Sequence, residues 1–370
     1  SGLCLYIGSY VMTRIKCLLL FFILIRSNTS ISQSRYVDSL IQYLEIAESD
    51  THKLSVLTRV IEAISDDAVW SKFNDQLGPL SKTLMLSSDS VIRIKASKHY
   101  SDYLNNKGYL SNNLGDITEA LDYFHQSLKI QERVGDKSGQ SYSLNNIGYI
   151  YSSQKQFVKA LEYYIKSYTL QKEISDLHGQ AQSLSNIGNI YDRTHSLKKA
   201  LYYYFKGLNI RRMIRDKHGI GYSLQNIGTV YFNQKNYFSA LYYFTKSLEI
   251  RKEISDVQGI SYSLSNMAKI YLEERNTKLA QKYALESLEM SQKMGYPENI
   301  STAATILEEV YLKEEKYGKA HEMLKLAVKM RDSISNDEIH KSTLKKQLQY
   351  EYEKREVVSK AEQEKRELTY

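Results

Sequence analysis

A repeat of 40 residues, kept without slippage through most of the chain, leaves few folds open to it. An alanine returns at the same place in six successive units: Ala120, Ala160, Ala200, Ala240, Ala280 and Ala320. Glycines at 108, 148, 188 and 228 keep the same step, and so do tyrosines at 151, 191, 231, 271 and 311. A fixed period of this length predicts a linear array of one supersecondary unit, stacked on copies of itself.

Within each unit the apolar spacing is that of a helix. The first segment places small and apolar residues at i, i+3, i+4 and i+7: Leu144, Ile147, Gly148 and Tyr151. The second segment follows a short polar stretch, "SSQKQF", and is marked by Ala160, Tyr164, Ser167 and Leu170. Only 2 Pro and 17 Gly occur in 370 residues, which favours long helices. The sequence therefore predicts an all-α fold, an α-solenoid of helical hairpins.

Particular residues are expected to shape each hairpin. Asp136 and its equivalents 40, 80 and 120 residues later stand where an N-cap is needed. Gly148 and Ala160 are expected to let the two helices approach closely. Tyr151 and Tyr164 are expected to fill the gaps between neighbouring hairpins.

The N-terminal residues 1–32 have the pattern of a leader with a signal peptide. Met12 is the expected start, followed by Arg14, Lys16 and the apolar run "CLLLFFILI", with small residues Ser30 and Ser32 before the expected cut. The apolar run is too short for a membrane span of roughly 20 residues. Export to the periplasmic side of a bacterial membrane is therefore expected, with an uncleaved membrane anchor as the alternative. The only cysteines, Cys4 and Cys17, lie in this leader, so no disulfide framework is expected.

The spacing of the repeat resembles the tetratricopeptide (TPR) pattern G-x-x-Y…A-x-x-x-F, carried here by Gly148, Tyr151, Ala160 and Tyr164. The unit is longer than the usual one of about 34 residues, and Lys172 stands near the place of the usual proline. The phrase "DKSGQSYSLNNIG" is similar to the long repeats of Pins-type polarity adaptors and kinesin light chains. We expect six TPR units over residues 95–335, preceded by degenerate helical repeats over 33–94.

An asparagine precedes each Ile-Gly pair or its equivalent, giving a ladder of Asn106, Asn146, Asn186, Asn226 and Asn266. In a TPR superhelix the first helices line the concave side, and the resemblance implies that this ladder faces inward. An amide offers both a donor and an acceptor, so a ladder of amides can hold an extended peptide backbone. The neighbouring positions vary, as specificity positions do: Tyr149, Asn189, Thr229 and Lys269. The alternative is a structural role, in which each asparagine bonds to the adjacent repeat and sets the twist.

No catalytic motif accompanies the repeats. The sequence has no G-x-x-x-x-G-K, H-E-x-x-H or G-x-S-x-G motif, and its eight histidines are scattered. We therefore expect no enzyme activity from these residues, no metal site and no cofactor. The formal charge is +8, but Lys and Arg are spread among Asp and Glu, so no nucleic-acid partner is expected.

From residue 336 the sequence becomes a charged segment without Gly or Pro, and a long helix is expected. Signal peptide, repeats and a tail like "QLQYEYEKREVVSKAEQEKRE" together resemble a family of bacterial membrane sensors. That resemblance implies a peptide-binding or protein-binding input domain, a membrane-anchored continuation and an output domain absent from this chain. A homodimer through the C-terminal helix is a further possibility. The alternative is a free-standing exported scaffold for protein complexes.

Overall fold

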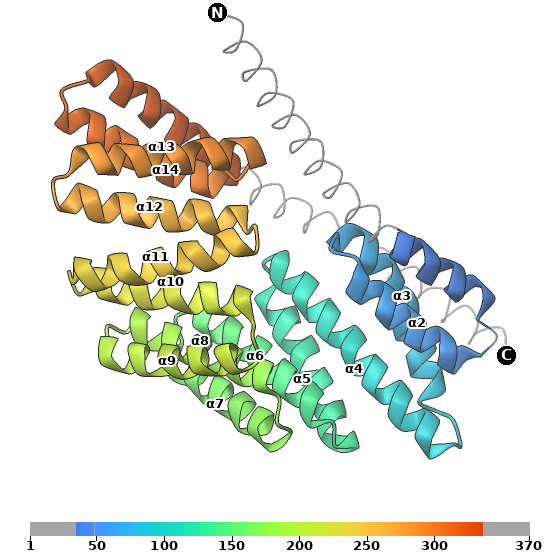
Figure 1. The fold of residues 1–370 in the computed structure, drawn as a ribbon. Helices are drawn as coiled ribbons and strands as arrows, with labels where there is room; N and C mark the ends of the chain where they lie inside the picture. The colour runs from blue at the N-terminus through green and yellow to red at the C-terminus, as the bar shows by residue number, and fades with distance from the viewer. Residues whose placement is uncertain (1–34, 48, 336–370) are drawn as a thin grey trace, which may run out of the picture. The chain divides into compact units, whose positions relative to one another are not determined.

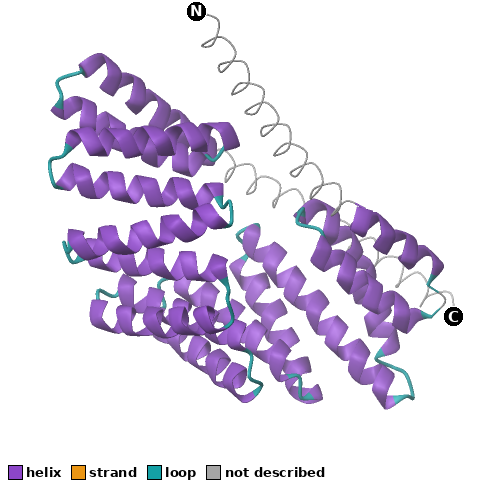
Figure 2. Ribbon diagram, in the orientation of Figure 1, coloured by secondary structure: helices purple, strands orange, loops and turns teal. Residues whose placement is uncertain are grey.

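The computed structural model describes residues 35–47 and 49–335, and this part of the chain is helical with no strand (Figure 2). The expected all-α fold is therefore confirmed. The leader and the charged segment from residue 336 lie outside the described residues. After a first helix over residues 35–46, the helices in chain order are α2 (Asp50–Ala63), α3 (Asp67–Leu84), α4 (Ser90–Asn113), α5 (Ile117–Val134), α6 (Lys137–Ser153), α7 (Phe157–Glu173), α8 (Leu177–Arg193), α9 (Leu197–Met213), α10 (Lys217–Asn233), α11 (Tyr237–Glu253), α12 (Val257–Glu273), α13 (Thr277–Met294) and α14 (Pro297–Lys313). A final described helix covers residues 317–335.

The chain divides into two compact units. Described residues up to Leu110, together with His125–Asp136, form the N-terminal unit. Ser111–Phe124 and the described residues from Lys137 onward form the repeat unit.

The repeat unit is a solenoid of antiparallel hairpins. The first helices α6, α8, α10 and α12 pack on the second helices α7, α9, α11 and α13 respectively, and each second helix packs on the next first helix (Figure 1). From α6 to α12 every helix has 17 residues and every turn has three, which yields the period of 40. The predicted α-solenoid of helical hairpins is therefore confirmed.

Each turn uses a residue in the left-handed region, spaced by 20 residues along the solenoid. The turn that ends α6 has Lys155 at φ 58°, and the amide of Gln156 donates to the carbonyl oxygen of Tyr151 at 2.8 Å. Glycine takes this conformation in three turns, and other residues take it at the remaining ones: Lys155, Ser175, His195, Arg215, Lys235, Ser255, Arg275 and Glu315. The six-to-one hydrogen bond satisfies a free carbonyl at the helix end, and this recurring turn ends each helix from α6 to α12 after 17 residues.

The N-caps expected from the repeated aspartate are confirmed where the caps are described. The carboxylate oxygens of Asp176, Asp216 and Asp256 each accept a hydrogen bond of 2.9 Å from the amide of the glycine three residues later. These bonds satisfy a free donor at the start of α8, α10 and α12.

The glycines bring the two helices of a hairpin together, as expected. A Cβ on Gly188 would lie 2.7 Å from the ring of Tyr204, and one on Gly148 would lie 2.8 Å from the ring of Tyr164. The assignment of Tyr151 and Tyr164 to the gaps between hairpins is correct only in part. Tyr151 stacks on Tyr163 of its own hairpin, with ring centroids 5.4 Å apart. Tyr164 lies against Gly148 of its own hairpin, because the missing Cβ opens a slot for the ring, and its outer side contacts the next hairpin at Ile187.

In the N-terminal unit, α2, α3 and α4 share a core that contains Leu54, Leu57, Leu77 and Ala96. A Cβ on Gly78 of α3 would lie 2.7 Å from the ring of Tyr103 on α4, so the glycine-on-tyrosine contact recurs outside the regular register. The assignment of residues 33–94 to degenerate repeats stays a prediction. Within the described ranges, none of the helices combines the length and apolar character needed to cross a bilayer.

Candidate functional site

The first helices of the hairpins lie side by side and form one continuous surface, here called the first-helix surface. Hydrogen bonds between residues 41 apart tie its rows together. The guanidinium of Arg193 on α8 donates to the carbonyl oxygen of Ser152 on α6 at 3.0 Å, and the amide of Asn299 on α14 donates to the carbonyl oxygen of Gln258 on α12 at 3.1 Å. The predicted asparagine ladder runs along this surface from α6 to α12, and each of its members there is half-buried.

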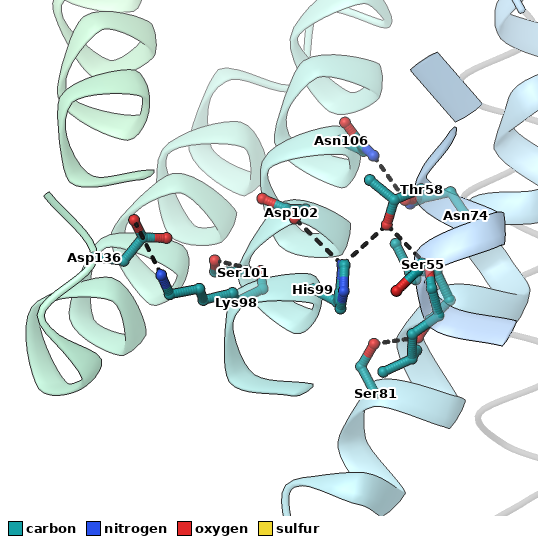
Figure 3. A network of polar contacts seen from close by, with 12 residues as sticks. Ser55, Thr58, Asn74, Ser81, Lys98, His99, Ser101, Asp102, Asn106 and Asp136 are labelled. Carbon is teal, nitrogen blue, oxygen red and sulfur yellow. Dashed lines mark hydrogen bonds and ion pairs between the residues drawn. The ribbon is translucent and has the colours of Figure 1, made fainter. Parts of the chain in front are cut away.

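One member of the ladder is fully engaged by the protein itself. The Nδ2 of Asn186 donates to Oδ1 of Asn145 on the preceding first helix at 2.9 Å. Its own Oδ1 accepts a bond of 3.3 Å from the side chain of Gln182. In the N-terminal unit, Nδ2 of Asn106 donates in the same way to Oδ1 of Asn74 at 2.9 Å (Figure 3). These two asparagines have the structural role that the sequence left open as an alternative.

Two other members are not engaged in this way. The buried Nδ2 atoms of Asn226 and Asn266 have no hydrogen-bond partner among the described residues. The residue 41 positions earlier is in neither case the asparagine that serves Asn186. For Asn226 it is Ser185, which has a shorter side chain and whose hydroxyl donates to the carbonyl oxygen of Ala181 at 3.0 Å.

For Asn266 the corresponding residue is Gln225, and a buried arginine occupies it. Oε1 of Gln225 accepts a bond of 2.6 Å from Arg251. Arg251 also pairs with the N-cap Asp256, with 2.7 Å between Nη1 and Oδ2. A Cβ on Gly259 would overlap the Arg251 guanidinium, so that glycine makes room for the cation. The sequence interpretation missed this arginine, although Arg211 and Arg251 recur 40 residues apart.

The predicted specificity positions divide in a similar way. Tyr149 is 59% exposed and available to a ligand. Asn189 accepts a bond of 2.7 Å from the hydroxyl of Tyr204, and the Thr229 hydroxyl donates to the carbonyl oxygen of Gln225 at 3.1 Å. Lys269 is half-buried, and burial lowers the pKa of its ammonium against the opposing effect of Glu309. Tyr149 and Lys269 therefore remain open to a partner, whereas Asn189 and Thr229 bond within the protein.

Asn146 lies half-buried on α6, four residues after the exposed Tyr142. Tyrosines in that same place precede the two unengaged amides, since Tyr222 is 39% exposed and Tyr262 is 41% exposed. The first-helix surface is thus lined by aromatic rings and amides, a combination suited to a polypeptide backbone.

A polar cluster lies in the N-terminal unit (Figure 3). Among its charged residues, the sequence predicted a role only for Asp136, as an N-cap. Nδ1 of His99 lies 2.9 Å from the Thr58 hydroxyl and 3.8 Å from Oδ2 of Asp102. Burial, followed by the charges of Asp136 and Glu62, raises the pKa of Asp102 to about 7. This cluster can change its charge near neutral pH.

Among the described residues, no three His, Cys, Asp or Glu side chains gather so as to hold a metal ion. The expectation that the protein uses no cofactor stays a prediction.

Solved structures with the same fold share little sequence with this chain. The apo form of RapI has 16% identity and a TM-score of 0.54, with 82% of this chain and 99% of that one covered. A Signal Transduction ATPase with Numerous Domains from Pyrococcus horikoshii, which has a tetratricopeptide repeat sensor, has 17% identity and a TM-score of 0.57 over 82% of this chain and 49% of that one. NprR in complex with its cognate peptide NprX has 19% identity and a TM-score of 0.53 over 84% and 86%.

At the level of sequence, comparison with curated proteins gives no match. The sequence model of the tetratricopeptide repeat does match, over residues 101–173, 140–213 and 220–293, which together span half of the chain. The chain therefore belongs to the tetratricopeptide repeat family.

Proposed function

We propose that the first-helix surface binds an extended peptide, or an extended segment of a partner protein. The observation that carries the proposal is the pair of unengaged amides on α10 and α12. A buried amide donor left without a partner costs about 1–3 kcal/mol. Turning the amide so that Nδ2 faces the surface lets a ligand carbonyl accept from it and removes this cost. Rotation about χ2 exchanges Nδ2 and Oδ1, so Asn226 and Asn266 can each offer a donor or an acceptor.

The exposed tyrosines beside these amides supply the apolar part of the site. Tyr222 and Tyr262 each stand one helical turn before an unengaged asparagine. Rigid aromatic rings bury a large area at low entropic cost, which suits them to contact the side chains of a peptide. NprR, which shares the fold, is a protein solved with a peptide bound.

The proposal narrows the predicted ladder to its C-terminal part. Asn106, Asn146, Asn186, Asn226 and Asn266 would then not contribute equally, since Asn186 already bonds at both polar atoms. The ligand backbone is held over α10 and α12, with Lys269 beside it. Asn186 links α8 to α6 through its bond to Asn145.

The test is a selection of random peptides from a phage library, followed by calorimetry with the best synthetic peptide. We expect Asn226→Ala combined with Asn266→Ala to weaken binding about tenfold or more, because two hydrogen bonds are lost at about 0.5–1.5 kcal/mol each. Asn186→Ala is the matched control. It should leave the affinity within about twofold of wild type while lowering stability by about 1 kcal/mol. Unchanged affinity in the double variant would exclude the amides as the contact.

We also propose that this binding surface is the extracytoplasmic input region of a bacterial transmembrane signalling protein. The leader-like pattern of residues 1–32 and the charged segment 336–370 support it, and both lie outside the described residues. A fusion of alkaline phosphatase after residue 335 tests the export step. Enzyme activity in the fusion supports it, and an inactive fusion leaves a peptide-binding scaffold that is not exported.

A further inference from the structure

A second surface lies along the turns that join the two helices of a hairpin. Because the hairpins stack in register, these turns form one edge of the repeat unit. Three successive turns, residues 154–159, 193–199 and 234–238, contain no Asp or Glu. We call these three turns the central turn edge. They hold five lysines: Lys155, Lys159, Lys198, Lys199 and Lys235.

These five lysines have no ion-pair partner. All five are exposed, and none has a carboxylate oxygen within 4.0 Å among the described residues. Lys159 and Lys199 lie over the faces of Tyr151 and Tyr191, at 5.1 and 5.2 Å from the ring centroids. Away from this edge, Lys217 pairs with Glu253 at 3.0 Å, and Lys293 pairs with Glu289 at 2.6 Å. The positive charge of the edge is therefore not neutralised by the protein.

Two large apolar side chains protrude from the same turns. Val158 is 84% exposed and Phe238 is 86% exposed. Equivalent positions in the neighbouring hairpins carry Lys198 and Lys278. The hairpin therefore does not need an apolar residue at this place, and packing does not explain Val158 or Phe238.

The pattern is confined to the central turns. The turn before them carries Asp116 and Glu119, and the turn after them carries Glu273 and Glu274. A general excess of lysine in the repeat would have appeared in all of these turns. The charge and the exposed apolar groups thus mark one local surface.

We propose that the central turn edge binds the surface of a bilayer that contains anionic lipids. The lysines meet the headgroup phosphates, and Val158 and Phe238 enter the boundary with the acyl chains. A juxtaposition of uncompensated lysines and isolated protruding apolar groups fits this partner, since a bilayer offers both anionic groups and an apolar layer beneath them. A purely polyanionic chain, such as poly-glutamate or heparin, would use the lysines and leave both apolar groups in water.

The test uses the full chain and sedimentation with two kinds of vesicle, phosphatidylcholine alone and phosphatidylcholine with 30% phosphatidylglycerol. We expect binding to the anionic vesicles that falls as NaCl is raised. Phe238→Ser should weaken partitioning about tenfold, the effect of losing one buried aromatic side chain. The triple variant K155Q/K198Q/K235Q should weaken it about a hundredfold, because each lysine contributes about fivefold near an anionic surface.

The matched controls remove the same amount of charge, or one exposed apolar side chain, from other surfaces. K137Q/K217Q/K293Q removes the same charge from lysines that have carboxylate partners, and Met213→Ser removes an exposed apolar group outside the central turn edge. Both should partition as wild type does. The apolar run from Cys17 to Ile25 is present in every variant, so the differences between variants report the edge alone.

Three results would overturn the proposal. The first is equal binding to both kinds of vesicle, and the second is equal partitioning of the edge variants and their controls. The third is binding to poly-glutamate or to heparin without binding to anionic vesicles, which would assign the edge to an acidic macromolecule.

Discussion

Gly188 and Tyr204 form a contact whose energy can be measured, because the chain contains its own compensated version. A Cβ on Gly188 would lie 2.7 Å from a ring carbon of Tyr204, and that ring is 1% exposed. The ring is also held by its hydroxyl, which donates to Asn189, so it has no free direction in which to move. Two hairpins later the same pair of positions holds Ala268 and Ala284, both fully buried.

The predicted energies follow from the packing. Gly188→Ala overpacks the hairpin and should destabilise the protein by about 2 kcal/mol. Tyr204→Ala leaves a cavity and should cost about 4 kcal/mol. In the double variant the new methyl group enters the space that the ring has left. Its cost should be about 4 kcal/mol, so the two substitutions are coupled by about 2 kcal/mol.

The assay is urea unfolding at 25 °C of the four proteins in the cycle, followed by far-ultraviolet circular dichroism and by tyrosine absorbance together. Coincident transitions by the two probes justify a single free energy of unfolding for each protein. Because loss of the bond between Tyr204 and Asn189 is common to the single and double variants, it cancels in the cycle. Additive effects within about 0.5 kcal/mol would refute the reasoning, and so would a Gly188→Ala variant as stable as wild type.

Three further outcomes follow from the turns, the caps and the polar cluster. Lys235→Gly should raise the free energy of unfolding by about 1 kcal/mol in the same assay, because Lys235 has φ 59°; no gain would show that the left-handed turn is unstrained. Asp176→Ala should lower the free energy of unfolding by about 1 kcal/mol, because an N-cap is lost. Asp256→Ala should lower it by about 3 kcal/mol, because it also leaves the buried Arg251 without its carboxylate partner. Equal losses in the two variants would contradict the role of the ion pair. The folded-state pKa of Asp102 is raised to about 7, so wild-type stability should fall as pH rises from 4 to 7. Asp102→Asn should remove that fall. Its gain in the free energy of unfolding at pH 8 should be only about 1 kcal/mol, since 46% of the Asp102 side chain is exposed. A variant with the same pH profile as wild type would exclude Asp102 as the titrating group.

The helices themselves could be predicted from the sequence because their signals are local. The i, i+3, i+4, i+7 spacing, the aspartate at each N-cap and the slot opposite each glycine all act within one hairpin. Gly148 and Tyr164 were correctly identified as packing residues. The contact of Tyr164 with Gly148 of its own hairpin was not predicted, because the sequence does not show whether a ring points into its own hairpin or toward the next one.

For the candidate peptide-binding site, the sequence predicted which positions form the row but not which of their side chains are free to bind. The sequence located the asparagines, but it treated all five as equivalent. In the repeat unit the residue 41 positions earlier differs from one asparagine to the next, and it is Asn145 for Asn186 but Ser185 for Asn226. Asn106 in the N-terminal unit bonds instead to Asn74, which lies 32 positions earlier. A register of 41 in a chain with a period of 40 arises from the offset between adjacent first helices, which no single hairpin encodes.

The sequence by itself determined the period, the helical hairpin in each repeat and its short turn, because each depends on hydrogen bonds and side chains within one repeat. Only the tertiary structure decided which polar groups are satisfied. Arg251 is paired because Asp256, the N-cap of α12, and Gln225 of α10 converge on it. Gln225, 41 positions before Asn266, bonds to Arg251, and Nδ2 of Asn266 has no partner among the described residues. The lysines of the central turn edge lack carboxylates because the stacking of hairpins brings together three turns that happen to have none. The hydrogen bonding of the proposed sites therefore depends on contacts between repeats, whereas the helices and their turns depend on contacts within them.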